Sequence, residues 1–193
     1  MTSSSSLGLW AMLLAVGATP ARAQQVDPDR QIAEAVSPLP QPQQAGATVL
    51  GYDAAGTLTT LRAGANGMVC LADDPTQPGF HVACYHQSLE PFMARGRALR
   101  AEGMTRPQVE SIRLAEIEAG RLAMPDHPAA LYSLSGGEGL DPETGTVLGA
   151  RPLFVVYVPY ATAESTGLST QPVQGRPWLM APGKPWAHIM VTR

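Results

Sequence analysis

Four polar side chains have the chemistry for hydrolysis: His127, His188, Glu164 and Ser165. An imidazole can transfer a proton near neutral pH, a carboxylate can orient it, and a hydroxyl can attack a carbonyl. Glu164 and Ser165 follow an apolar segment, and loops at strand ends often carry function. The nucleophile elbow of hydrolases reads Gly-x-Ser-x-Gly, however, and Ala163 replaces its first glycine. The pattern therefore favours structural roles, with an envelope hydrolase using His188 or His127 and a nearby carboxylate as the alternative.

The residues around the two histidines also favour structural roles. His127 is flanked by Asp126 and Pro128, with Pro125 just before them, so it is expected in a rigid turn, although an Asp–His pair facing a pocket stays open. His188 falls in an apolar C-terminal segment, where a hydrogen-bonded structural histidine is the default.

Cys70 and Cys84 are the only cysteines in the chain. An even number of cysteines in an exported protein indicates a disulfide, and a loop of this length would contribute roughly 3 kcal/mol. A metal-binding protein is a further alternative, because His81 and His86 lie beside Cys84 and zinc prefers such ligands. Their spacing matches no closed zinc pattern, so the sequence favours the Cys70–Cys84 disulfide and predicts no cofactor.

Aromatic residues mark a possible binding surface near the C-terminus. Aromatic side chains can stack on sugars or peptides, although ordinary packing of a loop onto the sheet is the favoured explanation. The weak ligand-binding candidates are Tyr157, Tyr160, Trp178 and Trp186.

Residues 1–23 have the layout of a cleavable signal peptide. An apolar run at 7–16 is followed by Pro20 and the small-x-small triplet Ala21-Arg22-Ala23. The run is too short to span a bilayer, which needs about 20 apolar residues. Cleavage would leave Gln24 first and 12 basic against 16 acidic side chains, an acidic balance that argues against a nucleic-acid partner. A secreted or periplasmic location and a chain that does not span a membrane after cleavage are therefore expected.

The periodicity predicts an α+β fold: a mostly antiparallel sheet with two or three helices packed on one face. Residues 24–46 are expected to form a helix and a Pro-rich extended linker at 38–42, and residues 47–193 a single domain. Charges alternate along the second of two central helices, which predicts a solvated face. The expected helices are 28–36, 88–102 and 106–120, and the expected strands are 47–52, 57–62, 68–71, 130–134, 153–158 and 187–192, the first three as a small meander.

Several segments together resemble a group of secreted bacterial proteins of unknown function. These proteins share a Cys-bearing segment and a C-terminal His-Ile-Met strand. The resemblance implies secretion and carries no activity. The segments are 61–67, 70–75, 124–128, 157–167 and 187–191.

The sequence thus favours a non-catalytic exported domain that binds a small molecule or an envelope protein. An aromatic-lined groove is what this hypothesis requires. The hydrolase requires a serine or carboxylate beside a histidine in a cleft, and the metal-binding protein requires His81, Cys84 and His86 to converge.

Overall fold

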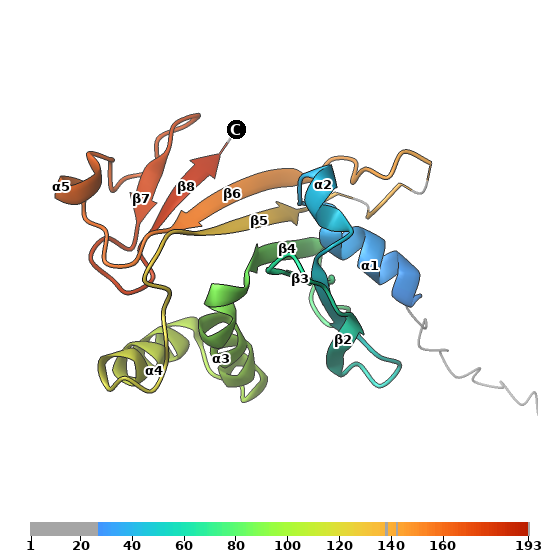
Figure 1. The fold of residues 1–193 in the computed structure, drawn as a ribbon, viewed down its shortest axis with the longest axis horizontal. Helices are drawn as coiled ribbons and strands as arrows, with labels where there is room; N and C mark the ends of the chain where they lie inside the picture. Colours follow the sequence, from blue (N-terminus) through green and yellow to red (C-terminus); the bar gives the residue numbers. More distant parts are fainter. Residues whose placement is uncertain (1–26, 138, 142, 193) are drawn as a thin grey trace, which may run out of the picture.

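The computed structural model describes residues 27–137, 139–141 and 143–192, and the predicted signal peptide lies outside them. Within these residues eight strands form one sheet in the order β2-β1-β3-β4-β5-β6-β8-β7 (Figure 1). Every strand pair is antiparallel except β1 with β3. The strands are β1 Thr48–Tyr52, β2 Leu58–Arg62, β3 Met68–Leu71, β4 His81–His86, β5 Ala129–Ser135, β6 Arg151–Tyr157, β7 Trp178–Met180 and β8 His188–Thr192.

The helices are α1 Pro28–Val36, α2 Gln41–Gln44, α3 Glu90–Ala101, α4 Arg106–Glu118 and α5 Ala163–Thr166, with a 3₁₀ turn η1 at Gln87–Leu89. The α+β class with a mostly antiparallel sheet is confirmed. None of the helices in the described residues is long and apolar enough to cross a membrane.

The N-terminal segment is more ordered than the predicted linker. The carboxylate of Asp27 accepts a hydrogen bond from the Asp29 amide at 3.0 Å and caps α1, as its sequence predicts. The prediction that residues 38–42 form an extended linker is wrong for the last two residues, because α2 begins at Gln41. Pro42 lies in the first turn of α2, where a proline's missing N–H costs nothing.

The first three strands do not form a meander. After β2 the chain crosses back over the start of β1, and the amides of Ala65 and Asn66 both donate to the Gly46 carbonyl. Gly64 allows this crossing, since a Cβ there would lie 2.2 Å from the Thr48 nitrogen. Strand β3 is therefore placed on the far side of β1 and parallel to it.

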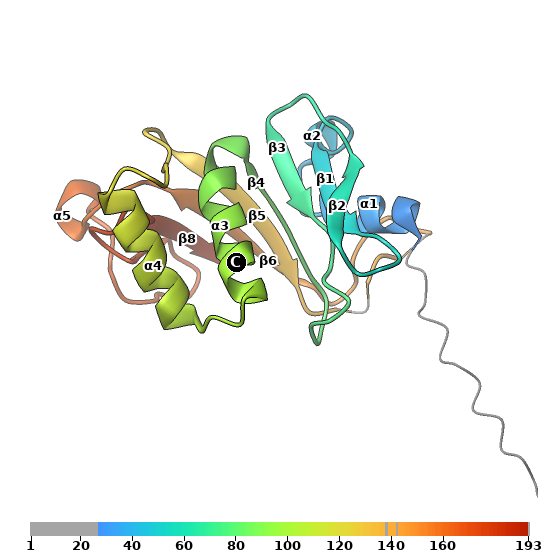
Figure 2. The same cartoon turned by 90° about the horizontal axis from the view of Figure 1, so that it is seen from below.

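Helices cover both faces of the sheet. Met68 and Cys70 of β3 belong to a core cluster with α1, whereas Val69 and Leu71 alternate to the other face, where Leu89 and Met93 pack. Figure 2 shows α3 and α4 in front of the sheet and α1 beyond β1 and β2. The central helices thus share one face as expected, and α1 packs on the opposite face because its apolar side covers β1, β3 and β4.

The disulfide Cys70–Cys84 is present, as predicted, and joins directly opposite residues of β3 and β4. Both cysteines are fully buried. Strand β4 itself was not predicted, since residues 71–83 have no periodicity. Strand β6 lies between β5 and β8, as its nearly continuous apolar sequence predicts for an interior strand.

Candidate ligand-binding site

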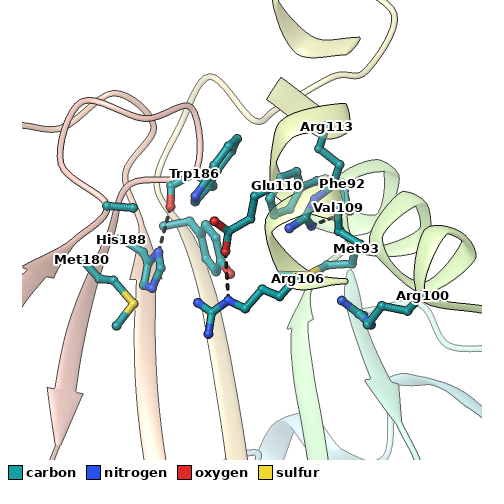
Figure 3. Close-up of a pocket in the computed structure, with 12 residues that line it drawn as sticks. Phe92, Met93, Arg100, Arg106, Val109, Glu110, Arg113, Met180, Trp186 and His188 are labelled. Atoms are coloured by element: carbon teal, nitrogen blue, oxygen red, sulfur yellow. Dashed lines mark hydrogen bonds and ion pairs between the residues drawn. The ribbon is translucent and has the colours of Figure 1, made fainter. Parts of the chain in front are cut away.

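A pocket of about 430 Å³ lies between the helical pair and the C-terminal strands (Figure 3). Three segments that are distant in sequence meet there, namely α3–α4, the end of β6, and β7 with the start of β8. Its volume falls within the usual range for small-molecule sites, about 300–1,000 Å³. The lining residues are Phe92, Met93, Arg100, Arg106, Val109, Glu110, Arg113, Tyr157, Met180, Ala181, Trp186 and His188.

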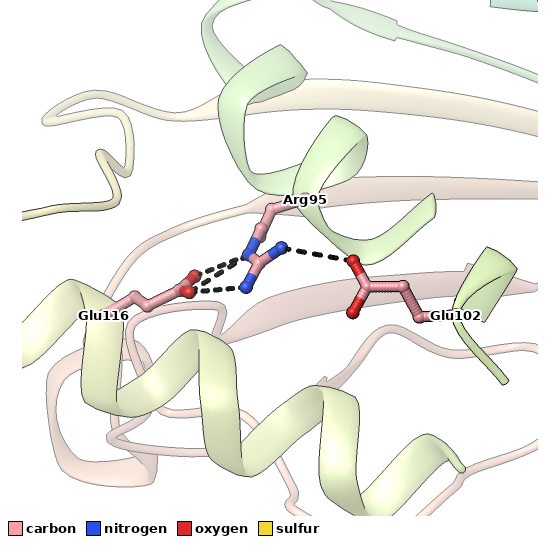
Figure 4. Close-up of polar contacts among 3 residues, drawn as sticks. All are labelled: Arg95, Glu102 and Glu116. Atoms are coloured by element: carbon pink, nitrogen blue, oxygen red, sulfur yellow. Dashed lines mark hydrogen bonds and ion pairs between the residues drawn. The ribbon is translucent and has the colours of Figure 1, made fainter. Parts of the chain in front are cut away.

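An ion pair fixes the two helices that form one wall. Arg95 of α3 donates from Nε and Nη2 to both carboxylate oxygens of Glu116 on α4, at 2.7–3.0 Å (Figure 4). Glu102 lies 3.9 Å from Arg95 on its other side. The hydrogen bonds from Arg95 lower the pKa of Glu116. The first turn of α4 is set by a capping box between Thr105 and Gln108.

Arg113 projects from α4 between the helices and the C-terminal strands. Its guanidinium carbon lies 3.7 Å from the centre of the Phe92 ring, a cation–π contact. Its Nη1 donates to the Phe92 carbonyl at 3.3 Å. Its Nε is buried and has no hydrogen-bond acceptor among the described residues. Burial, together with the positive charge of Arg100, lowers the pKa of Arg113, which stays far above neutral pH because an arginine cannot be deprotonated in a protein.

The charges around the pocket are predominantly positive. Arg100, Arg106 and Arg113 line it, and Glu110 is its only carboxylate in the described part of the chain. Glu110 is paired with Arg106 at 2.9 Å. Arg100 and Arg113 have no ion pair within the described residues, so the pocket carries an excess of two positive charges.

Aromatic rings form the opposite wall. Trp186 stacks on Phe92 with ring centres 5.8 Å apart, and the ring centres of Tyr157 and His188 are 4.9 Å apart. His188 donates from Nδ1 to the Trp186 carbonyl at 2.8 Å, which leaves Nε2 as the acceptor of a neutral ring. Burial lowers the pKa of His188, so the ring is neutral at pH 7, and burial raises the pKa of the Tyr157 hydroxyl.

The structure brings together three of the side chains singled out from the sequence: Tyr157, Trp186 and His188. The other two aromatic candidates lie outside the pocket. Tyr160 is 57% exposed at a turn, and Trp178 pairs across the strands with Met190.

Three residues of the hydrolase hypothesis, Glu164, Ser165 and His127, lie outside the pocket that contains His188. The Ser165 hydroxyl accepts from the Thr162 amide at 2.9 Å, within the cap of α5, and Glu164 is exposed in the same short helix. His127 contacts Asp126 at 2.8 Å on the surface, with 53% and 97% of their side chains exposed. The Asp–His pair therefore exists, but Asp126 is almost fully solvated.

The metal hypothesis also lacks its cluster. Cys84 is in the disulfide, and His81 and His86 lie at opposite ends of β4. The His86 ring instead meets His127 edge-on at 5.9 Å, and its Nδ1 accepts a hydrogen bond from the Ser88 amide at 3.3 Å. The described residues contain no group of three or more His, Cys, Asp or Glu side chains that could hold a metal ion.

Sequence reasoning missed the arginines and Phe92. The alternating charges of α4 predicted a solvated face, which is wrong for Arg113 and Glu116, because both are partly buried against α3. One signal was available: Gly96 interrupts α3, and a glycine inside a helix often marks a close approach.

Comparisons with known proteins identify no relative. No family model matches the chain, and neither a curated protein nor a solved structure is similar to it. The resemblance to secreted proteins of unknown function therefore stays a prediction.

Proposed function

We propose that the protein is an exported binding protein that takes a small molecule into the pocket between α3, α4 and the C-terminal strands. The observation that carries the proposal is the pocket wall itself. Apolar and aromatic groups from three distant segments, among them Phe92, Tyr157 and Trp186, face one hollow together with a few polar groups. This combination is typical of ligand sites, in which apolar surface supplies affinity and few polar groups set orientation.

Two further observations support the details. The fully buried disulfide agrees with folding in an oxidising compartment, which is where an exported binding protein works. The only carboxylate in the described part of the pocket, Glu110, is bound to Arg106, and Ser165 lies in a helix cap. A binding role is compatible with these contacts, whereas a hydrolase would require Glu110 or Ser165 to leave its present partner.

The test is a comparison of native and denatured masses for protein purified from its natural host. We expect the native mass to exceed the denatured mass by a small molecule. The variant Trp186→Ala should lose that excess because it removes the aromatic wall, whereas Trp178→Ala, a tryptophan outside the pocket, should keep it. Equal native and denatured masses, together with no bound compound in a small-molecule screen by ligand-observed NMR, would overturn the proposal.

A further inference from the structure

Arg113 is the one partly buried arginine in the described chain whose guanidinium is poorly supplied with protein acceptors. Arg95 donates to both oxygens of Glu116, and Arg97 donates to Glu90 at 2.6 Å and to the Tyr85 hydroxyl at 2.7 Å. Arg62 donates to two backbone carbonyls at 3.1 and 2.5 Å. Arg113 makes a single bond of 3.3 Å. Leaving a buried donor unpaired costs free energy, so the fold alone does not explain its position.

The neighbouring helix is shaped to accept this guanidinium. Gly96 is buried in the middle of α3, and a Cβ there would lie 2.9 Å from Nη1 of Arg113. Glycine inside a helix is unfavourable relative to alanine, because it loses more backbone freedom on folding. The sequence thus tolerates a less stable helix at the point where Arg113 enters the pocket wall.

The local charge selects an anion. Arg100 and Arg106 add positive charge on the same side, and the described residues offer only Glu110 in return. Arg100 and Arg106 are exposed, so their contribution is screened by salt, whereas Arg113 is held against Phe92 in a less solvated position. An anionic group beside Arg113 would compensate the positive charges of the three arginines, which the fold holds close together.

The shape of the site narrows the anion to a planar one. A guanidinium presents its N–H groups in one plane, which matches a carboxylate in a bidentate pair. The rings of Phe92 and Trp186 are inclined by only 26° to each other, and such aromatic surfaces favour contact with a flat apolar group. The neutral His188 adds a hydrogen-bond acceptor at Nε2 for a donor on the ligand.

We infer that the pocket binds an aromatic or similarly flat carboxylate, and that Arg113 pairs with its carboxylate group while Trp186 and Phe92 contact its ring. This inference rests on the proposed small-molecule function and deepens it. It concerns recognition only and involves no covalent step.

The test uses two probes of the same shape, 2-naphthoate and its neutral analogue 2-naphthamide. Both are titrated into the mature protein by isothermal calorimetry at pH 7.5 and low salt. We expect the acid to bind at least about tenfold more tightly than the amide, because hydrogen bonds to a charged acceptor are stronger. In Arg113→Met this preference should disappear, whereas the matched variant Arg151→Met, an exposed arginine at the start of β6, should keep it.

The outcomes distinguish a failure of the carboxylate inference from a failure of the proposed small-molecule binding. Equal affinity of acid and amide in the unmodified protein, with both weakened by Trp186→Ala, would overturn the carboxylate and leave small-molecule binding in place. No heat from either probe at millimolar concentration would also overturn the carboxylate inference, and the native mass comparison would then decide the function. If Arg113→Met fails to fold, Arg113→Lys keeps the charge without the fork, and an undiminished preference in it would contradict the bidentate pairing.

Discussion

His188 makes the fold sensitive to acid. Burial is the main cause of its lowered pKa, and the charge of Arg106 lowers the pKa further. A histidine that resists protonation when folded takes up its proton more readily when unfolded, so the unfolded state gains stability as pH falls below about 6.5. Its contribution is complete above that pH and is lost as pH falls through the folded pKa.

We therefore expect the free energy of unfolding to decrease between pH 7.5 and pH 5, and the variant His188→Gln to show a smaller decrease. Urea denaturation at the two pH values measures this. His81→Gln, at an exposed position of β4, is the control and should behave as the unmodified protein. An identical pH dependence in His188→Gln would show that other groups cause the effect.

Gly96 provides a second prediction at the residue scale. In Gly96→Ala the new methyl group would lie 2.9 Å from Nη1 of Arg113 and 3.5 Å from Nη1 of Arg100, so the helix gains stability while the Arg113 guanidinium must move. We expect the free energy of unfolding to change by less than about 1 kcal/mol, and 2-naphthoate affinity to fall several-fold.

Gly103→Ala is the contrasting variant. Gly103 has φ of +81° after α3 and nothing within 4 Å of its Cβ position. Alanine there should cost about 1 kcal/mol of stability and leave the naphthoate affinity unchanged. If the naphthoate affinity is unchanged in Gly96→Ala as well, Arg113 does not contact the ligand.

At the residue scale the sequence located three of the twelve residues that line the pocket. Tyr157, Trp186 and His188 stand out because aromatic and imidazole side chains carry recognisable chemistry. Arg113 and Arg106 could not be distinguished from an ordinary charged helix face, because charge patterns along α4 do not reveal which turn faces α3. That information lies in the crossing of two helices, which depends on contacts between distant residues.

At the element scale, the ion pair between Arg95 and Glu116 is one of the contacts that join α3 and α4. Glu116 is 19% exposed and bound by two nitrogens of Arg95, a better geometry than most surface pairs. We expect Glu116→Gln to reduce the free energy of unfolding by no more than about 1 kcal/mol at low salt, and the difference to shrink in 1 M NaCl. Because Arg95 lowers the pKa of Glu116, the stabilisation should be full above the unfolded pKa of about 4.5 and lost as pH falls through the folded value.

Glu118→Gln on the same helix is the matched control, since Glu118 is exposed. Thermal unfolding at the two salt concentrations gives the comparison. A loss that is equal for both variants, or one that does not respond to salt, would show that the Arg95–Glu116 contact does not hold the helices.

The elements that the sequence predicts are those with strong local signals. Asp27-Pro28, the Thr105–Gln108 box and the apolar run of β6 each act within a few residues, and each appears in the structure. The apolar run of β4 spans only Val82 to Tyr85 between two histidines, and it follows a turn-rich segment, so its own residues give a weak strand signal. The short β7 at the sheet edge depends on β8 for its pairing. These strands are specified by their neighbours more than by their own residues.

At the scale of the whole molecule, the proposed export predicts the chemical form of the chain. Protein from the natural host should begin at Gln24 and have a denatured mass about 2 Da below its reduced mass, as one disulfide requires. Because both cysteines are fully buried, a thiol-specific reagent should not label the native protein, and should label it twice after reduction in denaturant. Mass spectrometry of both samples measures this, and a chain that retains Met1 would contradict export with cleavage.

The strand order at the C-terminal side has a consequence for the time course of folding. Strand β7 precedes β8 in the chain but lies outside it in the sheet, so β7 gains its only partner in the described sheet when the last strand is in place. Met180 at the end of β7, Trp186 and His188 thus enter the pocket together with the final residues of the chain. Strand β8 also has to pair with β6, which joins Tyr157 to His188, and such non-local pairings form slowly. We therefore expect a refolding chain to gain its binding capacity in its slowest kinetic phase, after α3 and α4 are already helical.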